Sequence, residues 1–308
     1  MPHTVLPRED RTAMGLTAMA GAVVFFTMID TSAKWLVLAG LPALQVVFVR
    51  YAVHFLLALA VFVPREGREA LVSMAPGKQI LRSAFLLGST ALNFNALYYL
   101  PITVTTTIMF AGPIVVTLLA IPLLGERVGM HRIIAVCVGF IGVLVVMQPW
   151  GTEFHSAMFF NLGALVCASM YFLMTRLLAG VESNATSQTW SSGLATLCIA
   201  PFALSSWVWP PAPADWVFFL LIGIFGGTGH ILATWAHRMA DASILAPVVY
   251  IQIVLAALSG IVFFNQWPTL WTLAGGLIII AAGFYIWQRE RILGKRAAAD
   301  KAANIAPH

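Results

Sequence analysis

The sequence predicts an all-α polytopic membrane protein, with ten transmembrane helices arranged as two five-helix repeats of inverted orientation. Composition is the first reason, because 60% of the 308 residues are hydrophobic and 9% are charged. Soluble domains carry about 25% charged residues. The second reason is a series of long apolar runs, and the third is a distant similarity between the two halves of the chain. These features indicate a chain embedded in a lipid bilayer.

Ten apolar runs approach the length of about 20 residues that a helix needs to cross a bilayer. Turn-forming residues separate the runs, as in "WPPAP" at 209–213. We therefore expect one transmembrane helix in each run. The runs cover residues 14–38, 42–63, 79–99, 102–123, 131–148, 156–178, 185–205, 216–238, 242–264 and 270–289.

The basic residues support this number of helices. Of the 17 Lys and Arg residues, all except Lys34 and Arg50 lie in the N-terminal segment, in alternate loops or in the C-terminal segment, with Arg82 counted in a loop. Positive residues concentrate on the cytoplasmic side of membrane proteins, so both termini are expected in the cytoplasm and the chain in the inner (plasma) membrane. The net charge of +5 therefore reflects topology, and no nucleic-acid partner is expected.

An internal repeat appears when the chain is shifted by about 140 residues. Residues 96–108 then fall on 236–248, and residues 122–133 fall on 262–273. Five helices is an odd number, so the second repeat must enter the membrane from the opposite side. Inverted repeats are typical of secondary transporters, whose substrate site lies near the bilayer midplane. The expected segments are a cytoplasmic N-terminal tail at 1–13, repeats at 14–148 and 149–289, and a basic cytoplasmic tail at 290–308.

Two long stretches resemble a known family. They are "ALYYLPITVTTTIMFAGPIVVTLLAIPLLGERVGMHRIIAVCVGFIGVLVV" at 96–146 and its echo at 236–283, "AHRMADASILAPVVYIQIVLAALSGIVFFNQWPTLWTLAGGLIIIAAG". Their short span, G-E-R ending and following glycine-bearing span resemble the drug/metabolite transporter superfamily of the ten-helix EamA type. The echo departs from this pattern where Asn265 and Gln266 replace Gly125 and Glu126.

The resemblance implies a transporter of small metabolites. It also implies that the first, third, fourth, sixth, eighth and ninth helices line a central cavity, with the fifth and tenth as outer braces. Within the family, the sequence is most similar to exporters of amino acids, including aromatic ones.

Three charged residues lie within the first two apolar runs: Asp30, Lys34 and Arg50. Each costs roughly 2.5 to 3.5 kcal/mol at a helix centre on insertion scales, so their presence needs a reason. Asp30 and Arg50 are expected at one depth, about 12 Å below the external surface, where they can pair. Lys34 lies one turn higher and can reach the interface by extending its side chain.

Two interpretations of these charges remain open. The three groups can satisfy one another structurally, because buried ions are usually paired. Alternatively they border a translocation cavity, where Arg50 or Lys34 binds a carboxylate and Asp30 binds an ammonium group. A cavity of mixed charge suits a zwitterion.

Further candidates for substrate binding form a layer of polar and aromatic residues near mid-membrane. Each can instead make an interhelical hydrogen bond, worth about 0.6 kcal/mol on average in one membrane protein. His54 is expected only to support Arg50. Pro113 and Pro247 interrupt helical hydrogen bonding and are candidate hinges. The further binding candidates are Asn93, Asn95, Tyr171, His230, Trp235, Tyr250 and Gln252.

Several classes of function lack their sequence motifs. The chain has no Walker motif for an ATP-driven pump and no H-E-x-x-H or G-x-S-x-G motif for a protease. "GIFGGTG" at 223–229 lacks the G-K-[ST] ending of a phosphate loop, so it is expected to permit close helix packing. The three cysteines lie in apolar runs without metal-binding spacing. We therefore expect no enzyme, catalytic residue, cofactor or metal.

The sequence thus favours a secondary transporter that exports small organic metabolites, foremost amino acids, by alternating access. The alternatives are an exporter or importer of another amphipathic drug or nucleotide-derived metabolite, and a channel-like uniporter. A purely structural scaffold leaves the buried charges unexplained. The expected partners are a small-molecule substrate and the lipid bilayer, with the oligomeric state left open.

Overall fold

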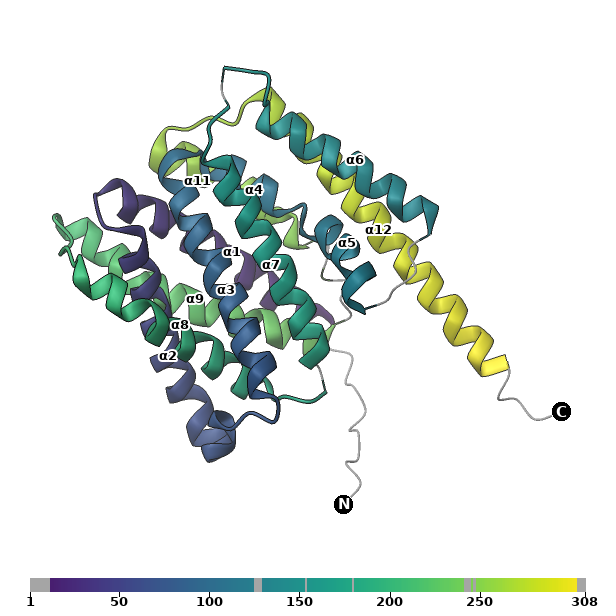
Figure 1. The fold of residues 1–308 in the computed structure, drawn as a ribbon, viewed down its shortest axis with the longest axis horizontal. Helices are drawn as coiled ribbons and strands as arrows, with labels where there is room; N and C mark the ends of the chain where they lie inside the picture. Colours follow the sequence, from purple (N-terminus) through teal and green to yellow (C-terminus); the bar gives the residue numbers. More distant parts are fainter. Residues whose placement is uncertain are drawn as a thin grey trace.

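A computed structural model of the protein describes residues 12–303, except 125–128, 153, 179, 241–244 and 246–247. The described part is a bundle of helices without strands (Figure 1). Its elements are α1 (Thr12–Leu38), α2 (Ala43–Glu66), the 3-10 helix η1 (Gly67–Leu71), α3 (Pro76–Tyr99), α4 (Ile102–Met109), α5 (Gly112–Leu124), α6 (Met130–Met147), α7 (Met158–Leu178), α8 (Asn184–Ser205), α9 (Pro213–Met239), α11 (Ile251–Phe264) and α12 (Leu270–Ala303).

Within the described residues, each of the ten apolar runs falls mainly on helix, although not always on one unbroken helix. The fourth run is divided between α4 and α5, and α11 covers only the later part of the ninth. Six helical spans in the described residues are long and apolar enough to cross a membrane. Of the remainder, α6 and α11 contain shorter apolar helices, while α3 and α8 are richer in polar residues. The chain is therefore an all-helical multi-pass membrane protein, for which length and apolarity alone support fewer spans than ten.

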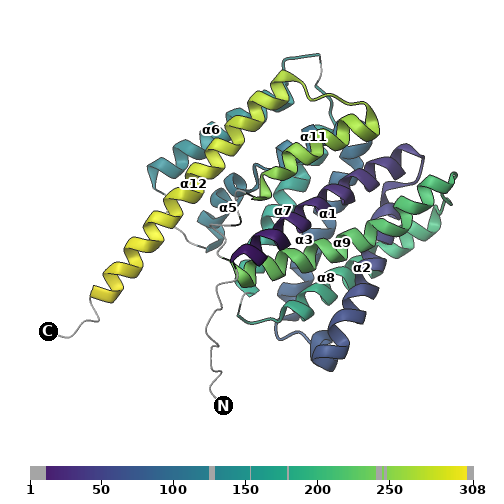
Figure 2. The same cartoon turned by 180° about the vertical axis from the view of Figure 1, so that it is seen from behind.

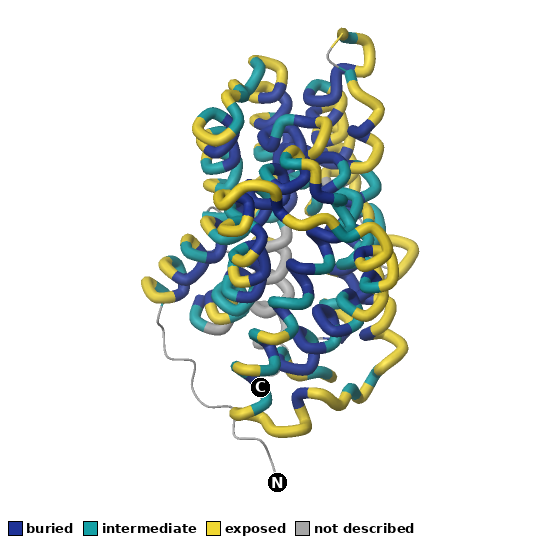
Figure 3. Tube along the Cα trace, turned by 90° about the vertical axis from the view of Figure 1, so that its left-hand side faces the viewer, coloured by how far each residue is buried: buried dark blue, intermediate teal, exposed yellow. Residues whose placement is uncertain are grey.

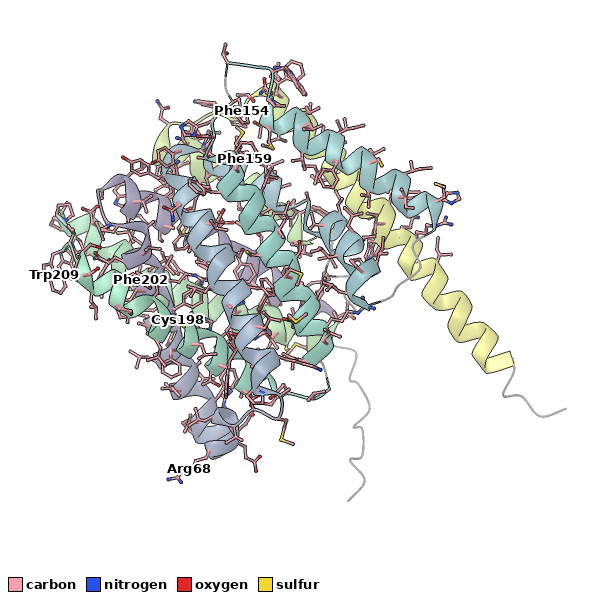
Figure 4. The ribbon with its side chains drawn as sticks, in the orientation of Figure 1. Arg68, Phe154, Phe159, Cys198, Phe202 and Trp209 are labelled. Carbon is pink, nitrogen blue, oxygen red and sulfur yellow. The ribbon has the colours of Figure 1, made fainter. Side chains whose placement is uncertain are left out.

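Large apolar side chains cover the outside of the bundle. Phe159 and Phe202, both labelled in Figure 4, are exposed over 62% and 60% of their surface. Figure 3 shows buried backbone stretches toward the centre and exposed ones at the periphery and in the connections. Soluble proteins rarely expose so much contiguous apolar surface, whereas a lipid-facing surface requires it.

Helices of the first half pack beside helices of the second half. α1 lies along α9 and α3 along α7, while α2 packs on α8, α4 on α11 and α6 on α12 (Figures 1 and 2). In terms of runs, the first pairs with the eighth and the third with the sixth. If each run is replaced by its counterpart in the other half, the pairing of the first and eighth runs becomes that of the sixth and third. The other three pairings, second with seventh, fourth with ninth and fifth with tenth, stay the same.

Contacts at the helix ends give the relative directions. The end of α3 meets the start of α7, where the rings of Tyr99 and His155 lie 5.1 Å apart. The start of α3 meets the end of α7, where the Ala75 amide donates to Glu182 Oε1 at 2.8 Å. α3 and α7 are therefore antiparallel. Lys34, near the end of α1, reaches Leu100 at the end of α3, so α1 and α3 are parallel and α7 runs opposite to α1.

The fourth run breaks between α4 and α5. Pro113 is the second residue of α5, a position where its missing N–H costs little, so the predicted hinge lies at the start of a helix. Phe110, at the break, lies 5.4 Å from the Tyr250 ring that precedes α11. A shift of 140 residues places these two residues on each other, so the corresponding points of the two halves are in contact. Pro247, the other predicted hinge, lies outside the described residues.

The glycines of "GIFGGTG" bring α9 close to its neighbours. A Cβ atom on Gly223 would lie only 2.3 Å from Cβ of Val53, and one on Gly229 would lie 3.0 Å from the Phe26 ring. A larger residue at Gly223 therefore cannot fit without separating α9 from α2. The expectation that this stretch permits close helix packing is confirmed.

Topology can be tested at two exposed residues that Figure 4 labels. The two residues lie at opposite ends of α2. Trp209 follows Val208, which bonds to Gln45 at the start of α2, whereas Arg68 lies in η1 beyond the end of α2. With the three native cysteines replaced by alanine, we expect a membrane-impermeant maleimide to label Trp209→Cys in intact cells. Arg68→Cys should react only after permeabilisation. The reverse pattern would place the termini outside the cell.

Candidate functional site

A cavity of about 130 Å³ lies among α1, α2, α3 and α4. Its wall combines apolar and aromatic side chains with one carboxylate, one guanidinium group, two hydroxyls and one amide. All of these residues belong to the first half of the chain. They are Phe26, Ile29, Asp30, Arg50, Ser89, Thr90, Asn93, Phe94 and Met109.

Asp30 is held by a chain of amides that crosses the bundle. Asn93 of α3 donates through Nδ2 to Asp30 Oδ1 at 3.2 Å. Asn161 of α7 in turn donates to Asn93 Oδ1 at 2.9 Å, and Asn161 is completely buried. These bonds fix the direction of the carboxylate and connect the cavity to the second half of the chain.

Arg50 uses little of its capacity to donate hydrogen bonds. Its Nη1 donates to Thr90 Oγ1 at 3.4 Å, which is a long contact, and Tyr51 shares that hydroxyl at 2.7 Å. Its Nε atom is buried without a partner. A guanidinium group has five N–H donors, so several remain available to a ligand.

The predicted Asp30–Arg50 pair is only partly realised. Both side chains face the same cavity, as their common depth predicts. Instead of bonding to each other, however, each bonds to α3, Asp30 through Asn93 and Arg50 through Thr90. The cavity therefore presents two separate charges of opposite sign.

Lys34 has a different environment from the one predicted. It is 1% exposed, and its Nζ donates to the backbone carbonyls of Leu97 at 2.8 Å and Leu100 at 2.6 Å. The expectation that it extends to the interface is wrong, because the end of α3 lies within its reach. A cation is favourable there, since the last carbonyls of a helix lack intrahelical partners and carry partial negative charge.

Lys34 is therefore expected to stabilise the fold without setting substrate affinity. In Lys34→Met, two buried carbonyls lose their donor, which should lower the free energy of unfolding by about 1 to 3 kcal/mol. Thermal unfolding in detergent and substrate saturation curves should show a lower Tm with an unchanged KM. Lys78→Met, at an exposed lysine, is the matched control. A raised KM at an unchanged Tm would instead place Lys34 in the substrate path.

Of the predicted binding residues, Asp30, Arg50 and Asn93 come together in the cavity wall. Asn95 donates to its own helix at Ala91, and Trp235 is 49% exposed. Tyr250 precedes α11 and Gln252 lies in its first turn, both half-buried. Tyr171 is buried against Arg82.

His230 is close to the cavity without belonging to its wall. Its ring lies 5.2 Å from Phe26, which does line the cavity, and it stacks on His54 at 5.6 Å with 10° between the planes. His54 is 1% exposed, and among the described residues neither of its ring nitrogens has a well-formed hydrogen bond, although the Gln188 side chain of α8 lies close by. The prediction treated His54 only as support for Arg50.

Arg82 belongs to a helix and not to a loop, contrary to the prediction from the sequence. It lies in the second turn of α3, is 3% exposed and donates to α7 and α8. Its Nη2 bonds to the Tyr171 hydroxyl at 2.8 Å, and its guanidinium group lies 4.5 Å from that ring. Its other bonds reach Thr175 Oγ1 at 2.7 Å, Ser187 O at 3.0 Å and Ser191 Oγ at 2.5 Å.

The model of the EamA-like transporter family matches the chain twice, at residues 13–148 and 155–288. A riboflavin transporter of Rhizobium johnstonii is 27% identical over 94% of this chain and 96% of its own. An S-adenosylmethionine uptake transporter of Rickettsia bellii is 27% identical over 83% of this chain and 88% of its own.

A solved crystal structure shares the fold with a TM-score of 0.57 at 18% identity, and the match covers 89% of this chain and 98% of that one. The two family matches together span most of the bundle that surrounds the cavity. The chain belongs to the EamA-like transporter family.

Proposed function

We propose that the protein is a secondary transporter that moves a small zwitterionic metabolite across the bacterial inner membrane. The observation that supports this most directly is a cavity with a carboxylate and a guanidinium group on one wall, Asp30 and Arg50. Charged residues within membrane helices are costly, and they usually face a bundle interior or a water-filled path. Their arrangement as two separate charges, each bonded to α3 and not to the other, suits a ligand that supplies both countercharges.

The preferred substrate carries an α-amino acid group. Its carboxylate accepts from the free donors of Arg50, and its ammonium group binds the Asp30 carboxylate. Phe26 and Phe94 then contact the remainder of the molecule. S-adenosylmethionine contains such a group, and the Rickettsia relative is named for its uptake. Free amino acids, moved outward, are the alternative that the sequence resemblance implies.

Riboflavin is a second candidate. Two phenylalanine rings, Phe26 and Phe94, lie in the cavity wall, where they can contact a planar ring system. The relative named as a riboflavin transporter matches nearly the whole length of this chain. Riboflavin has no carboxylate, so under this alternative Arg50 donates to a carbonyl oxygen.

Alternating access between two inverted repeats is the proposed mechanism. It is supported by the exchangeable helix pairings and by the opposite directions of α1 and α7. The helix break before Pro113 provides a point at which one part of the bundle can rotate. In this proposal ten spans cross the membrane, both termini lie in the cytoplasm, and the halves move about the cavity.

Flux into proteoliposomes tests the proposed function. Radiolabelled S-adenosylmethionine, riboflavin, L-tryptophan and L-leucine are offered to vesicles with and without the purified protein. We expect saturable uptake of S-adenosylmethionine that accelerates when the vesicles contain unlabelled substrate, because a carrier returns faster when loaded. Uptake that does not saturate and shows no acceleration would indicate a channel. Uptake of riboflavin alone would favour the second candidate.

A further inference from the structure

Three polar groups beside the cavity form a continuous set that substrate binding alone does not explain. Arg50 and His54 lie one turn apart on α2, and His230 of α9 stacks on His54. Phe26 connects His230 back to the cavity wall, which also contains Arg50. The set therefore begins and ends at the cavity and includes residues from both halves of the chain.

The most unusual property of this set is that some of its buried nitrogen atoms lack well-formed hydrogen bonds. Among the described residues, Arg50 Nε and both ring nitrogens of His54 are buried without a well-formed hydrogen bond, although the side chain of Gln188 in α8 lies near enough to His54 to interact with it. Burial of such atoms without a well-formed hydrogen bond lowers stability. A structural role does not require this cost, because an apolar residue fills the same space without it.

The second half packs directly against these groups through glycines. Glycines of α9 face them: a Cβ on Gly226 would lie 3.7 Å from Arg50 Nε, and one on Gly227 would lie 3.3 Å from His54 Cδ2. The tightest of these contacts is with Leu57, at 3.0 Å from the Gly227 Cβ position. An uncharged imidazole can occupy such a site, and so can a charged one if an anion accompanies it.

The charges that act on the two imidazoles come from α2 and α3. Arg50 acts on both rings, and Arg82 of α3 acts on His230. Asp30 of α1 faces Arg50 across the cavity, and Asn93 also bonds to it. A proton on His54 therefore adds a positive charge next to Arg50. A carboxylate bound at Arg50 removes that repulsion, so the proton and the anion favour each other's binding.

We propose that the His54–His230 pair couples transport to protons. One proton from water binds the His54 imidazole when the substrate carboxylate binds Arg50, and it leaves when the substrate leaves. His230 keeps the ring of His54 in place and shields it from solvent. This inference rests on the proposed function, because it requires a substrate with an anionic group in the cavity.

Two transport assays in proteoliposomes separate coupling from transport, with the membrane potential clamped by potassium and valinomycin. The first measures exchange of radiolabelled for unlabelled S-adenosylmethionine at equal pH. The second measures accumulation driven by an inwardly directed gradient of one pH unit. With one proton per substrate, the wild type should accumulate up to roughly tenfold, since one pH unit is worth about 1.4 kcal/mol.

His54→Gln retains a polar side chain but does not titrate. We expect its exchange to stay within about threefold of wild type, because His54 has no well-formed hydrogen bond that the substitution would break. Its gradient-driven accumulation should disappear. His237→Gln is the control, since His237 is exposed and bonds to its own helix at Ala233. It should retain both activities.

A calorimetric titration of the wild type makes the test independent of any variant. Heats of S-adenosylmethionine binding in two buffers of different ionisation enthalpy should show uptake of about one proton per substrate, as linkage requires. Uptake of no proton overturns the inference, as does accumulation that survives in His54→Gln. Normal exchange without any effect of the pH gradient also overturns it, while the proposed function stands. Absence of exchange for S-adenosylmethionine, riboflavin and tryptophan alike overturns both.

Discussion

Replacement of Asp30 by Asn should reduce transport by roughly 30-fold to more than 1,000-fold, because loss of one buried charge partner costs about 2 to 5 kcal/mol. Asparagine has the same shape, and its carbonyl oxygen can still accept the hydrogen bond from Asn93. The fold should therefore be retained while the charge that attracts an ammonium group is lost. Initial rates of substrate uptake, together with Tm, measure the two effects. Glu69→Gln, at an exposed carboxylate, is the matched control.

The double exchange Asp30→Arg with Arg50→Asp distinguishes a cavity of two separate charges from a structural ion pair. Since Asp30 bonds to Asn93 and Arg50 to Thr90, exchange of the charges leaves both without their α3 partners. We expect the double variant to be no more active than either single variant. Recovery of transport in the double variant would show that the two residues act as a pair.

Loss of Arg82 should have the largest effect on stability. Its four hydrogen bonds join α3 to neutral hydroxyls and a backbone carbonyl of α7 and α8, and each hydrogen bond to a charged group is worth about 1.5 to 3 kcal/mol. Arg82→Ala should lower Tm strongly and reduce the amount of monodisperse protein recovered in detergent. Arg68→Ala, at an exposed arginine of η1, should change neither.

Arg82→Lys refines this prediction. Lysine retains the charge but has three donors instead of the planar set that reaches both helices, so an intermediate Tm is expected. If Arg82→Ala instead keeps its Tm and loses transport, the network belongs to the transport path and not to the stability of the bundle.

The sequence predicts the helices well, because apolar runs and turn residues are local features. It also identifies Asp30 and Arg50, since charges within apolar runs are visible without any structure. It misjudges Arg82, which is close to the start of a run and resembles a loop cation. Its burial depends on hydroxyls of Tyr171 and Thr175 about 90 residues away, and no local pattern reports such partners.

Lys34 and Asn161 show a related difficulty. Lys34 bonds to two backbone carbonyls at the end of α3. The sequence predicts the end of a span only to within a few residues, so it cannot predict where these carbonyls lie. Asn161 lies in an apolar run, as Asn93 does, yet only the packing of α7 against α3 shows that the two bond. An amide within a predicted span was the available signal. The hydroxyls of Ser89 and Thr90 gave less, because serine and threonine commonly bond to their own helix.

Among the described residues, all those that line the cavity belong to the first half of the chain. Under the proposed mechanism, a molecule bound there would keep the same contacting side chains while the second half moves, so it would stay attached to the first repeat throughout transport. Affinities measured from the two faces of the membrane should then be nearly equal. The direction of net transport would then follow from the gradients that a cell maintains, so the same carrier could import or export its substrate.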